Sequence, residues 1–162
     1  MPERPPVTTR GKQTSVWRID RARFRGDILS GEGARRYGGR WNPVGVPAIY
    51  TSQSRALAAL EVLVHLSAID TPKIVHDISE IEFPSRLTEW PAIERLNLDL
   101  LDERQTQEFG RQWVEGNRSL VLAVPSLLIR EEFNFIINPR HRYFHRVAVS
   151  RQRPFVFDPR LK

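Results

Sequence analysis

Two residues of this chain, Arg40 and Glu61, belong to residue types that bind ligands and catalyse reactions, and both stand in unusual surroundings. Arg40 directly follows a Gly-Gly pair and precedes Trp41. Because glycine has no side chain, the backbone there can approach a ligand closely. Glu61 interrupts an otherwise almost wholly apolar run, residues 56–64. A buried carboxylate is costly unless a partner compensates it, so Glu61 is a candidate functional group.

These residues belong to one continuous stretch for which the sequence predicts two strands and a helix. The strands are expected over residues 40–42 and 46–51, with a Gly/Pro turn between them. The helix is expected over residues 54–66, and because it is apolar nearly all round we expect it to be buried. His65 would lie one helical turn after Glu61, so a structural ion pair between them is the alternative to a functional Glu61.

The rest of the chain predicts short strands and few helices, which favours an α+β domain. We expect a flexible N-terminal arm over residues 1–13 and a single domain over residues 14–162. Residues 21–39 show little periodicity and predict a mobile loop with one helical turn near Ala22. A further helix is expected over residues 106–114. The remaining predicted strands are residues 14–20, 73–83, 119–124, 133–137, 147–149 and 155–157.

Composition limits the class of protein. The chain has 162 residues, a net charge of +6 and no cysteine. This length fits one domain, and no window approaches the ~20 apolar residues of a membrane span. The absence of cysteine excludes disulfides and thiolate metal sites, and it fits the reducing cytoplasm, where we expect the protein to act. The positive charge suits an acidic partner, a phosphorylated small molecule or a nucleic acid.

Other chemistries have weaker support in the sequence. It contains no glycine-rich phosphate loop, no dinucleotide-binding glycine motif and no nucleophile elbow. His141 and His145 have no glutamate between them and no helical context, so a metal site is not favoured. Without a recognised nucleic-acid motif, the basic side chains near the C-terminus favour a solvated or partner-binding surface over direct contact with DNA or RNA. These side chains are Arg140, Arg142, Arg146, Arg151 and Arg153.

From Val16 to Phe157 the sequence resembles the RES domain toxins of bacterial toxin–antitoxin pairs. The resemblance is carried by GGRWNPVGVPAIYTS, by SRALAALEVLVH, and by VPS with FNFIINPRH downstream. It implies an ADP-ribosyltransferase-like α+β fold, with short strands in a split antiparallel sheet and a few helices. It also implies an enzyme that destroys NAD as its substrate and needs no cofactor or metal. The family's arginine, glutamate and serine correspond to Arg40, Glu61 and Ser126, its tyrosine to Tyr50, and a histidine of some relatives to His65.

The chemistry of these side chains suits that activity. NAD carries a cationic nicotinamide as its leaving group, so its glycosidic bond can break without the acid that ordinary glycosides need. Glu61 would bond the ribose hydroxyls and stabilise the oxocarbenium ion, and Arg40 would hold the pyrophosphate. Tyr50 would lie against the nicotinamide ring with its hydroxyl free to bond. Ser126 would bond a ribose or Glu61 itself, and His65 would be a further NAD contact.

Structural alternatives exist for three of these residues. Arg40 could pair with a surface carboxylate, Tyr50 could be a core residue, and Ser126 could cap a turn. The resemblance favours an NAD glycohydrolase or phosphorylase over two alternatives, a mono-ADP-ribosyltransferase with a protein target and a non-catalytic basic binding module. The usual partner in the family is a Xre-type helix-turn-helix antitoxin, which would block the site. Contact with DNA would then be indirect, and the protein could also form a homo-oligomer.

Overall fold

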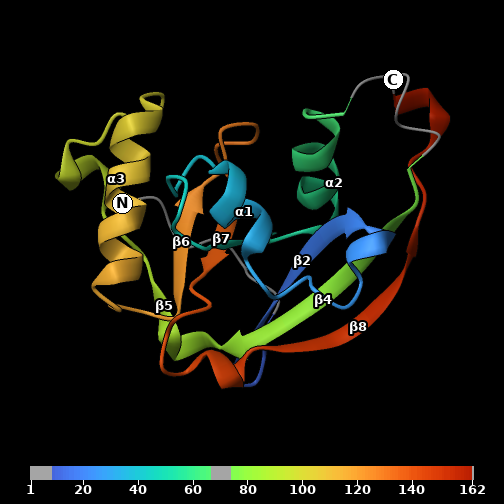
Figure 1. Cartoon of the computed structure of the whole chain (residues 1–162), viewed down its shortest axis with the longest axis horizontal. Coiled ribbons are helices and arrows are strands. Elements are labelled where there is room, and N and C mark those ends of the chain that lie inside the picture. Colours follow the sequence, from blue (N-terminus) through green and yellow to red (C-terminus); the bar gives the residue numbers. More distant parts are fainter. Residues whose placement is uncertain (1–8, 67–73, 162) are drawn as a thin grey trace.

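Within the described residues, 9–66 and 74–161, eight strands form one sheet in this computed structural model (Figure 1). The strand order is β5-β6-β7-β3-β2-β4-β8, and β1 pairs with β2. All pairs are antiparallel except β5 with β6. The strands are β1 (Thr9–Arg10), β2 (Gln13–Arg21), β3 (Ile49–Ser52), β4 (His76–Pro84), β5 (Thr88–Glu89), β6 (Val121–Pro125), β7 (Phe133–Ile137) and β8 (Ala148–Phe155).

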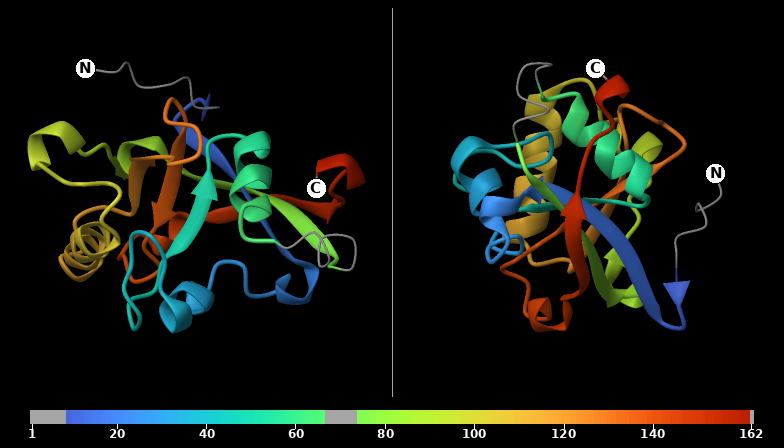
Figure 2. Two further views of the ribbon diagram at one scale, coloured as in Figure 1. Left: turned by 90° about the horizontal axis from the view of Figure 1, so that it is seen from above. Right: turned by 90° about the vertical axis from the view of Figure 1, so that its right-hand side faces the viewer.

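The sheet is split between β2 and β3. These two strands share the single register pair Trp17 with Ser52, whereas β2 pairs with β4 along its whole length from Gln13 to Arg21. Figure 2 shows β3 and β7 running in a different direction from β2, β4 and β8. The strands therefore separate beyond Trp17, and a gap opens between the two halves of the sheet. The predicted split antiparallel sheet is confirmed.

In the described part of the chain, three α-helices lie around this sheet: α1 (Glu32–Tyr37), α2 (Arg55–Leu63) and α3 (Glu103–Glu115). Ser54 caps α2 by accepting the Leu57 N–H on its hydroxyl, and Asp102 caps α3 by accepting the Arg104 N–H on its carboxylate. In Figure 1, α3 lies beside β6, and α2 lies on the other side of α1, above β2. The 3-10 turns are Ala22–Phe24, Ser85–Leu87, Ile93–Leu96, Phe144–Arg146 and Pro159–Leu161.

Within the part of the chain that the structure describes, apolar side chains form three clusters that fix this arrangement. The first joins both halves of the sheet through residues such as Val16, Ile81 and Phe135. The second packs Trp113 of α3 against Leu122 and the segment before β3. The third packs α2 onto β2 and β4, with members Trp17, Ile19, Ala58, Leu63, Ile78 and Phe157. Each half of the sheet thus has its own helix, and the shared cluster holds the halves together.

Several sequence-based expectations were wrong in detail. The expected strand over residues 40–42 is a tight turn, closed by backbone bonds between Gly39 and Asn42. In place of two strands at 147–149 and 155–157, the structure has one strand, β8 (Ala148–Phe155), so residues 156 and 157 lie outside it. It continues through Pro154 because β8 is an edge strand, where proline's missing N–H breaks no ladder bond.

The helix around Glu61 is shorter and less buried than expected. It spans Arg55–Leu63 in place of residues 54–66. Leu60 within the helix is 40% exposed, and Val64 directly after it is 56% exposed. The helix predicted over residues 106–114 is α3, which is longer than predicted and spans Glu103–Glu115.

The expected loop over residues 21–39 contains α1, which an Arg35–Glu32 ion pair of 2.8 Å supports, and the predicted helical turn near Ala22 is confirmed. Residues 1–8 of the expected arm and Lys73 of an expected strand lie outside the described residues. The rest of that arm is ordered, because β1 (Thr9–Arg10) pairs with the start of β2. None of the described helices is long and apolar enough to cross a membrane.

Candidate active site

Glu61 is held by two side chains from distant parts of the chain. The Ser126 hydroxyl donates to Oε1 of Glu61 at 2.9 Å, and the Asn134 side-chain amide donates to the same oxygen at 2.6 Å. Among the described residues, no donor reaches Oε2. The carboxylate is therefore fixed in orientation through one oxygen, and the other oxygen is available to a ligand.

Ser126 serves two purposes at the start of the β6–β7 loop. It is 1% exposed, and its Oγ accepts the backbone N–H groups of Leu128 and Ile129 at 3.0 and 3.2 Å while it donates to Glu61. The sequence offers a turn cap and a bond to Glu61 as alternatives for Ser126, and the structure shows both. Ser126 therefore helps to orient the Glu61 carboxylate.

A cavity of about 170 Å³ lies where the two halves of the sheet separate. Glu61 reaches it from the same side of α2 as Ala58 and Val62, since residues three and four apart share a helix face. The other lining residues are 17–20 of β2, 50–52 of β3, and Asn134 of β7. The split in the sheet therefore creates the space into which Glu61 points.

Tyr50 lines this cavity, but its hydroxyl is not free. It donates to Oδ1 of Asn42 at 2.7 Å and accepts the Trp41 N–H at 2.9 Å. Burial is the main cause that raises the pKa of this hydroxyl, so it stays protonated and keeps donating. The expectation of a free hydroxyl was wrong. Only the ring of Tyr50 remains available to a ligand.

Arg40 lies in the turn that Tyr50 holds from one side and α3 holds from the other. Thr106 donates its hydroxyl to the Arg40 carbonyl at 2.5 Å, and Gln107 donates to the Gly39 carbonyl at 2.9 Å. A Cβ on Gly110 would lie 1.6 Å from the Trp41 carbonyl oxygen, so only glycine allows this approach. No described carboxylate pairs with the Arg40 guanidinium, which leaves it free for an anion. Arg40 itself does not line the cavity of Glu61.

His65 does not join this arrangement. It lies just beyond the end of α2 and is exposed, and it is not among the residues that line the cavity. No ion pair joins it to Glu61 within the described residues. The structural alternative of a Glu61–His65 pair was therefore wrong, and a role for His65 in binding stays a prediction.

Sequence reasoning missed three polar residues of the site: Asn134, Arg18 and Asp20. Asn134 also accepts the Ser52 hydroxyl at 2.9 Å, so it links β3, β7 and Glu61. The sequence does single out Asn134, because it is the one amide in the apolar strand 133–137, just as Glu61 is the one carboxylate in an apolar helix. Arg18 and Asp20 belong to the strand predicted over residues 14–20, and only the split in the sheet brings them to a cavity.

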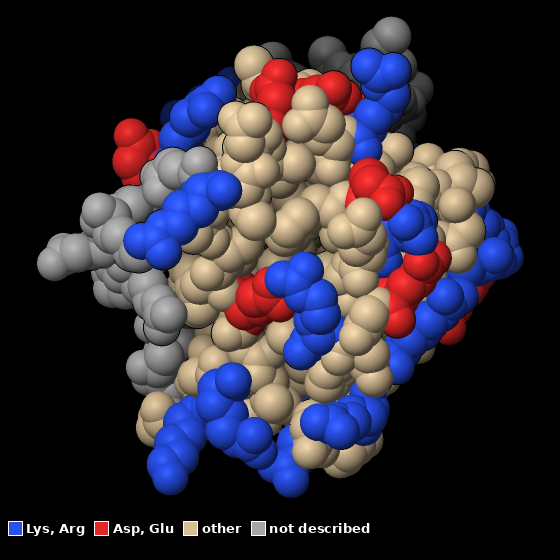
Figure 3. All heavy atoms as spheres, turned by 90° about the vertical axis from the view of Figure 1, so that its left-hand side faces the viewer, with Lys and Arg blue, Asp and Glu red and all other residues tan. Residues whose placement is uncertain are grey.

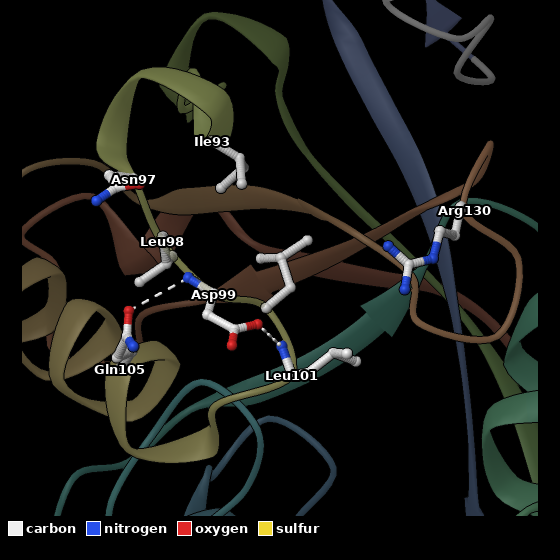
Figure 4. A pocket seen from close by; sticks show the side chains of 8 residues that line it. Ile93, Asn97, Leu98, Asp99, Leu101, Gln105 and Arg130 are labelled. Atoms are coloured by element: carbon white, nitrogen blue, oxygen red, sulfur yellow. Dashed lines mark hydrogen bonds between the residues drawn. The ribbon is translucent and has the colours of Figure 1, made fainter.

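A larger hollow of about 610 Å³ lies elsewhere, between α3, the segment that precedes it and the β6–β7 loop (Figure 4). Arg130 reaches toward it from the loop, while Gln105 of α3 accepts the Asp99 N–H at 3.2 Å on its opposite side. It is open and lined partly by leucines, and it contains none of the predicted site residues. We place the chemistry in the smaller cavity because the fixed carboxylate lies there.

The charged surface gives little support to nucleic-acid binding. On the face that carries α3, acidic and basic side chains lie side by side near the middle, and basic ones gather along the lower edge (Figure 3). Of the candidate arginines, Arg142 lies over the Tyr143 ring at 4.9 Å and Arg151 lies 4.0 Å from Glu80. Within the described residues, no group of three or more histidines, cysteines or carboxylates could hold a metal ion.

Comparison with known proteins decides the family. The model of the RES domain matches residues 15–158. The chain belongs to the RES domain family. The predicted resemblance is thereby confirmed.

Two relatives match over most of this chain and over nearly all of their own length. The Prs ADP-ribosylating toxin of Sphingobium sp. is 36% identical, over 91% of this chain and 96% of that protein. Toxin Res of Yersinia enterocolitica is 37% identical, over 91% of this chain and 99% of that protein.

A third relative is similar both in a short segment and in fold. The NAD(+) phosphorylase MbcT of Mycobacterium tuberculosis is 60% identical over 37 residues, which is 22% of this chain and 20% of that protein. The crystal structure of the M. tuberculosis MbcT–MbcA toxin–antitoxin complex matches with a TM-score of 0.72. The match has 22% identity and covers 92% of this chain and 86% of that chain, so the two share a fold.

Proposed function

We propose that this RES domain protein is a toxin that depletes NAD by cleaving the bond between nicotinamide and ribose. The observation that carries the proposal is Glu61, which two donors hold by Oε1 in a cavity while Oε2 has no donor among the described residues. The name of the relative MbcT, an NAD(+) phosphorylase, supports NAD as the substrate.

One carboxylate suffices for this reaction. The bond from C1″, the anomeric carbon of the nicotinamide-bearing ribose, to the nicotinamide nitrogen breaks, and nicotinamide leaves with the electron pair, which neutralises its ring. Glu61 stabilises the positive charge that develops on the ribose, and an acceptor oxygen then bonds C1″. A water acceptor loses its proton to solvent, whereas an anionic phosphate oxygen has no proton to lose. Because the carboxylate is held in place before the charge develops, little reorganisation is needed.

Arg40 supplies the second part of the site. Its guanidinium has no described partner, and the turn that carries it is fixed by Thr106, Gln107 and Tyr50. A planar fork suits the two adjacent phosphates of NAD. The cavity of about 170 Å³ is too small for a whole dinucleotide, so the pyrophosphate would lie outside it, toward this turn.

The acceptor is water or inorganic phosphate in the first form of this proposal, and the name of MbcT supports phosphate. The relative named Prs ADP-ribosylating toxin supports a second candidate, in which a protein side chain accepts the ADP-ribose. Both use the same cavity and the same Glu61. They differ only in the product.

We propose an antitoxin of the Xre type as the partner, since an enzyme that consumes NAD must be silenced in its own cell. The matched MbcT is in a toxin–antitoxin complex, which supports a partner of this kind. Exposed apolar side chains neighbour Glu61 and Ser126 along the chain. They are Leu60 of α2, Val64 directly after α2, and Leu128 on the loop that Ser126 begins. Such a patch next to a cavity suits a protein that covers it.

The test is to incubate the purified protein with NAD, with and without phosphate, and to identify the products by mass spectrometry. We expect nicotinamide with ADP-ribose or its 1″-phosphate. Glu61→Gln keeps the shape of the side chain and its contacts with Ser126 and Asn134 but removes the charge. It should lower the rate on the order of 10²–10³-fold. Glu108→Gln, on the exposed face of α3, is the matched control.

A second experiment tests the toxin role in cells. Expression of the chain alone should stop growth and lower NAD, and Glu61→Gln or co-expression of the adjacent gene should relieve both effects. A folded, abundant and harmless wild-type protein would refute the toxin role. NAD cleavage at the wild-type rate by folded Glu61→Gln would refute the role of Glu61.

A further inference from the structure

Arg18 and Asp20 form an ion pair inside the cavity that holds Glu61. They are two residues apart on β2, so their side chains lie on the same side of the strand. NH2 of Arg18 lies 2.6 Å from Oδ2 of Asp20, and the two side chains are 25% and 24% exposed. Both residues line the cavity. The proposed reaction gives neither of them a role so far.

The pair has hydrogen-bonding capacity that its own contacts do not use. NH1 of Arg18 donates to the Tyr50 carbonyl at 2.9 Å, across the gap between β2 and β3. Its Nε is buried and has no described partner, and a guanidinium has more N–H groups than these contacts occupy. Asp20 accepts the Arg21 N–H on Oδ1 at 2.8 Å, and each carboxylate oxygen can accept a further bond. A fixed donor and a fixed acceptor thus lie side by side.

A primary carboxamide is the complement of such a pair, because it presents a carbonyl oxygen next to an NH2 group. A carboxylate in the same place would present two acceptors, and one of them would face Asp20. The cavity of about 170 Å³ has room for one substituted ring, and the rings of Trp17 and Tyr50 border it. Its ionised side chains are Glu61, Asp20 and Arg18, whose net negative charge favours a cationic ring.

We propose that Arg18 and Asp20 recognise the carboxamide of the nicotinamide ring and thereby select NAD against its deamidated form, nicotinic acid adenine dinucleotide. Arg18 donates to the amide oxygen, and Asp20 accepts from the amide nitrogen. In the deamidated form the ring carries a carboxylate, which Asp20 repels and which leaves Asp20 without its donor. This inference rests on the proposed function and adds a specificity determinant to it.

The test is to compare kcat/KM for the two dinucleotides. The wild-type protein should prefer NAD by about 10²-fold or more, because a site built to bond a substrate NH rejects an analogue that lacks it. Asp20→Asn should lower this preference about tenfold or more, chiefly by improving cleavage of the deamidated substrate. Asparagine still accepts from Arg18 through its oxygen, and its amide can donate to a carboxylate.

Asp77→Asn is the matched control. Asp77 is the register partner of Asp20 on β4 and also pairs with an arginine, Arg25, at 2.6 and 2.9 Å, but it does not line the cavity. This variant should lower stability and leave the preference for NAD unchanged. The preference is the ratio of kcat/KM for NAD to kcat/KM for the deamidated dinucleotide. Both values scale with the fraction of folded protein, so that fraction cancels from the ratio.

Equal cleavage of both dinucleotides by the wild-type protein would overturn the inference and leave the proposed function intact. An unchanged preference in folded Asp20→Asn would overturn it as well. If neither dinucleotide is cleaved, the proposed function fails together with the inference. Should Asp20→Asn not fold, inhibition of the wild-type protein decides: free nicotinamide should inhibit and nicotinic acid should not, and equal inhibition would overturn the inference.

Discussion

Asn134 donates its side-chain amide to Oε1 of Glu61 over 2.6 Å, although the two residues are 73 positions apart in the chain. Antiparallel pairing of β7 with β3 brings Asn134 beside Ser52, and the Ser52 hydroxyl fixes the orientation of its amide. Ser126 reaches the same oxygen of Glu61 from the end of β6. The orientation of the Glu61 carboxylate is therefore a property of the sheet as much as of α2.

Asn134→Ala should lower kcat on the order of 10–10²-fold with little change in KM, because Glu61 would lose one of its two anchors and leave the productive geometry. Steady-state kinetics with NAD provide the measurement. Gln152→Ala removes an amide on β8 that bonds Ser79, outside the cavity, and should leave kcat unchanged. A wild-type kcat in Asn134→Ala would mean that Ser126 alone positions Glu61.

Arg40→Ala should raise KM for NAD by about 10–10²-fold, the value of a charge-assisted hydrogen bond. Arg40→Lys should recover only part of this loss, because lysine keeps the charge but lacks the planar fork. Arg104→Ala, which removes a side chain that is 93% exposed, is the control and should keep the wild-type KM. If Arg40→Ala binds NAD as tightly as the wild-type protein, the pyrophosphate lies elsewhere.

Gly110→Ala should destabilise the protein by about 1–3 kcal/mol, as overpacking does, because the new Cβ would lie 1.6 Å from the Trp41 carbonyl oxygen. The helix α3 would have to move away from the turn that carries Arg40, so KM should rise too. Thermal unfolding and kinetics measure the two effects. Gly33→Ala in α1 meets no atom within 4 Å and should be neutral or stabilising. Similar melting temperatures for the two variants would contradict the packing argument.

Stability should fall as the pH is lowered from 7 toward 5. Burial is the main cause that lowers the pKa of both His76 and His141 below the usual 6.5. Above pH 6.5 these imidazoles are neutral in both states, so their contribution is fully present. Below it the unfolded chain takes up protons that the folded protein binds only at lower pH, and stability is lost.

Melting temperatures across this pH range measure the effect. His76→Gln and His141→Gln should each flatten the dependence, whereas exposed His145→Gln should not. If stability still falls toward pH 5 after both buried histidines are replaced, other titrating groups cause the pH dependence.

The sequence alone determined the local elements and the main candidates for chemistry. The helix α2 follows from its Ser54 cap and its apolar run, and β7 spans the predicted residues 133–137, because caps and periodicity are local properties of the chain. The sequence also marked Arg40 and Glu61, because a polar residue in apolar or glycine-rich surroundings is visible without a structure. The order and spacing of longer motifs indicated the RES family.

Only the tertiary structure decided how these residues combine. The register of β7 against β3 brings Asn134 to Glu61, and the separation of β2 from β3 exposes Arg18 and Asp20 to the same cavity. The contact between Gly110 and the Trp41 carbonyl holds the turn that stands in place of the predicted strand at Arg40. All of these contacts join segments far apart in the chain, and strand register and helix packing set them through the burial of the whole apolar core. No local pattern in the sequence therefore predicts which strands pair in which register or which helix face packs on which turn.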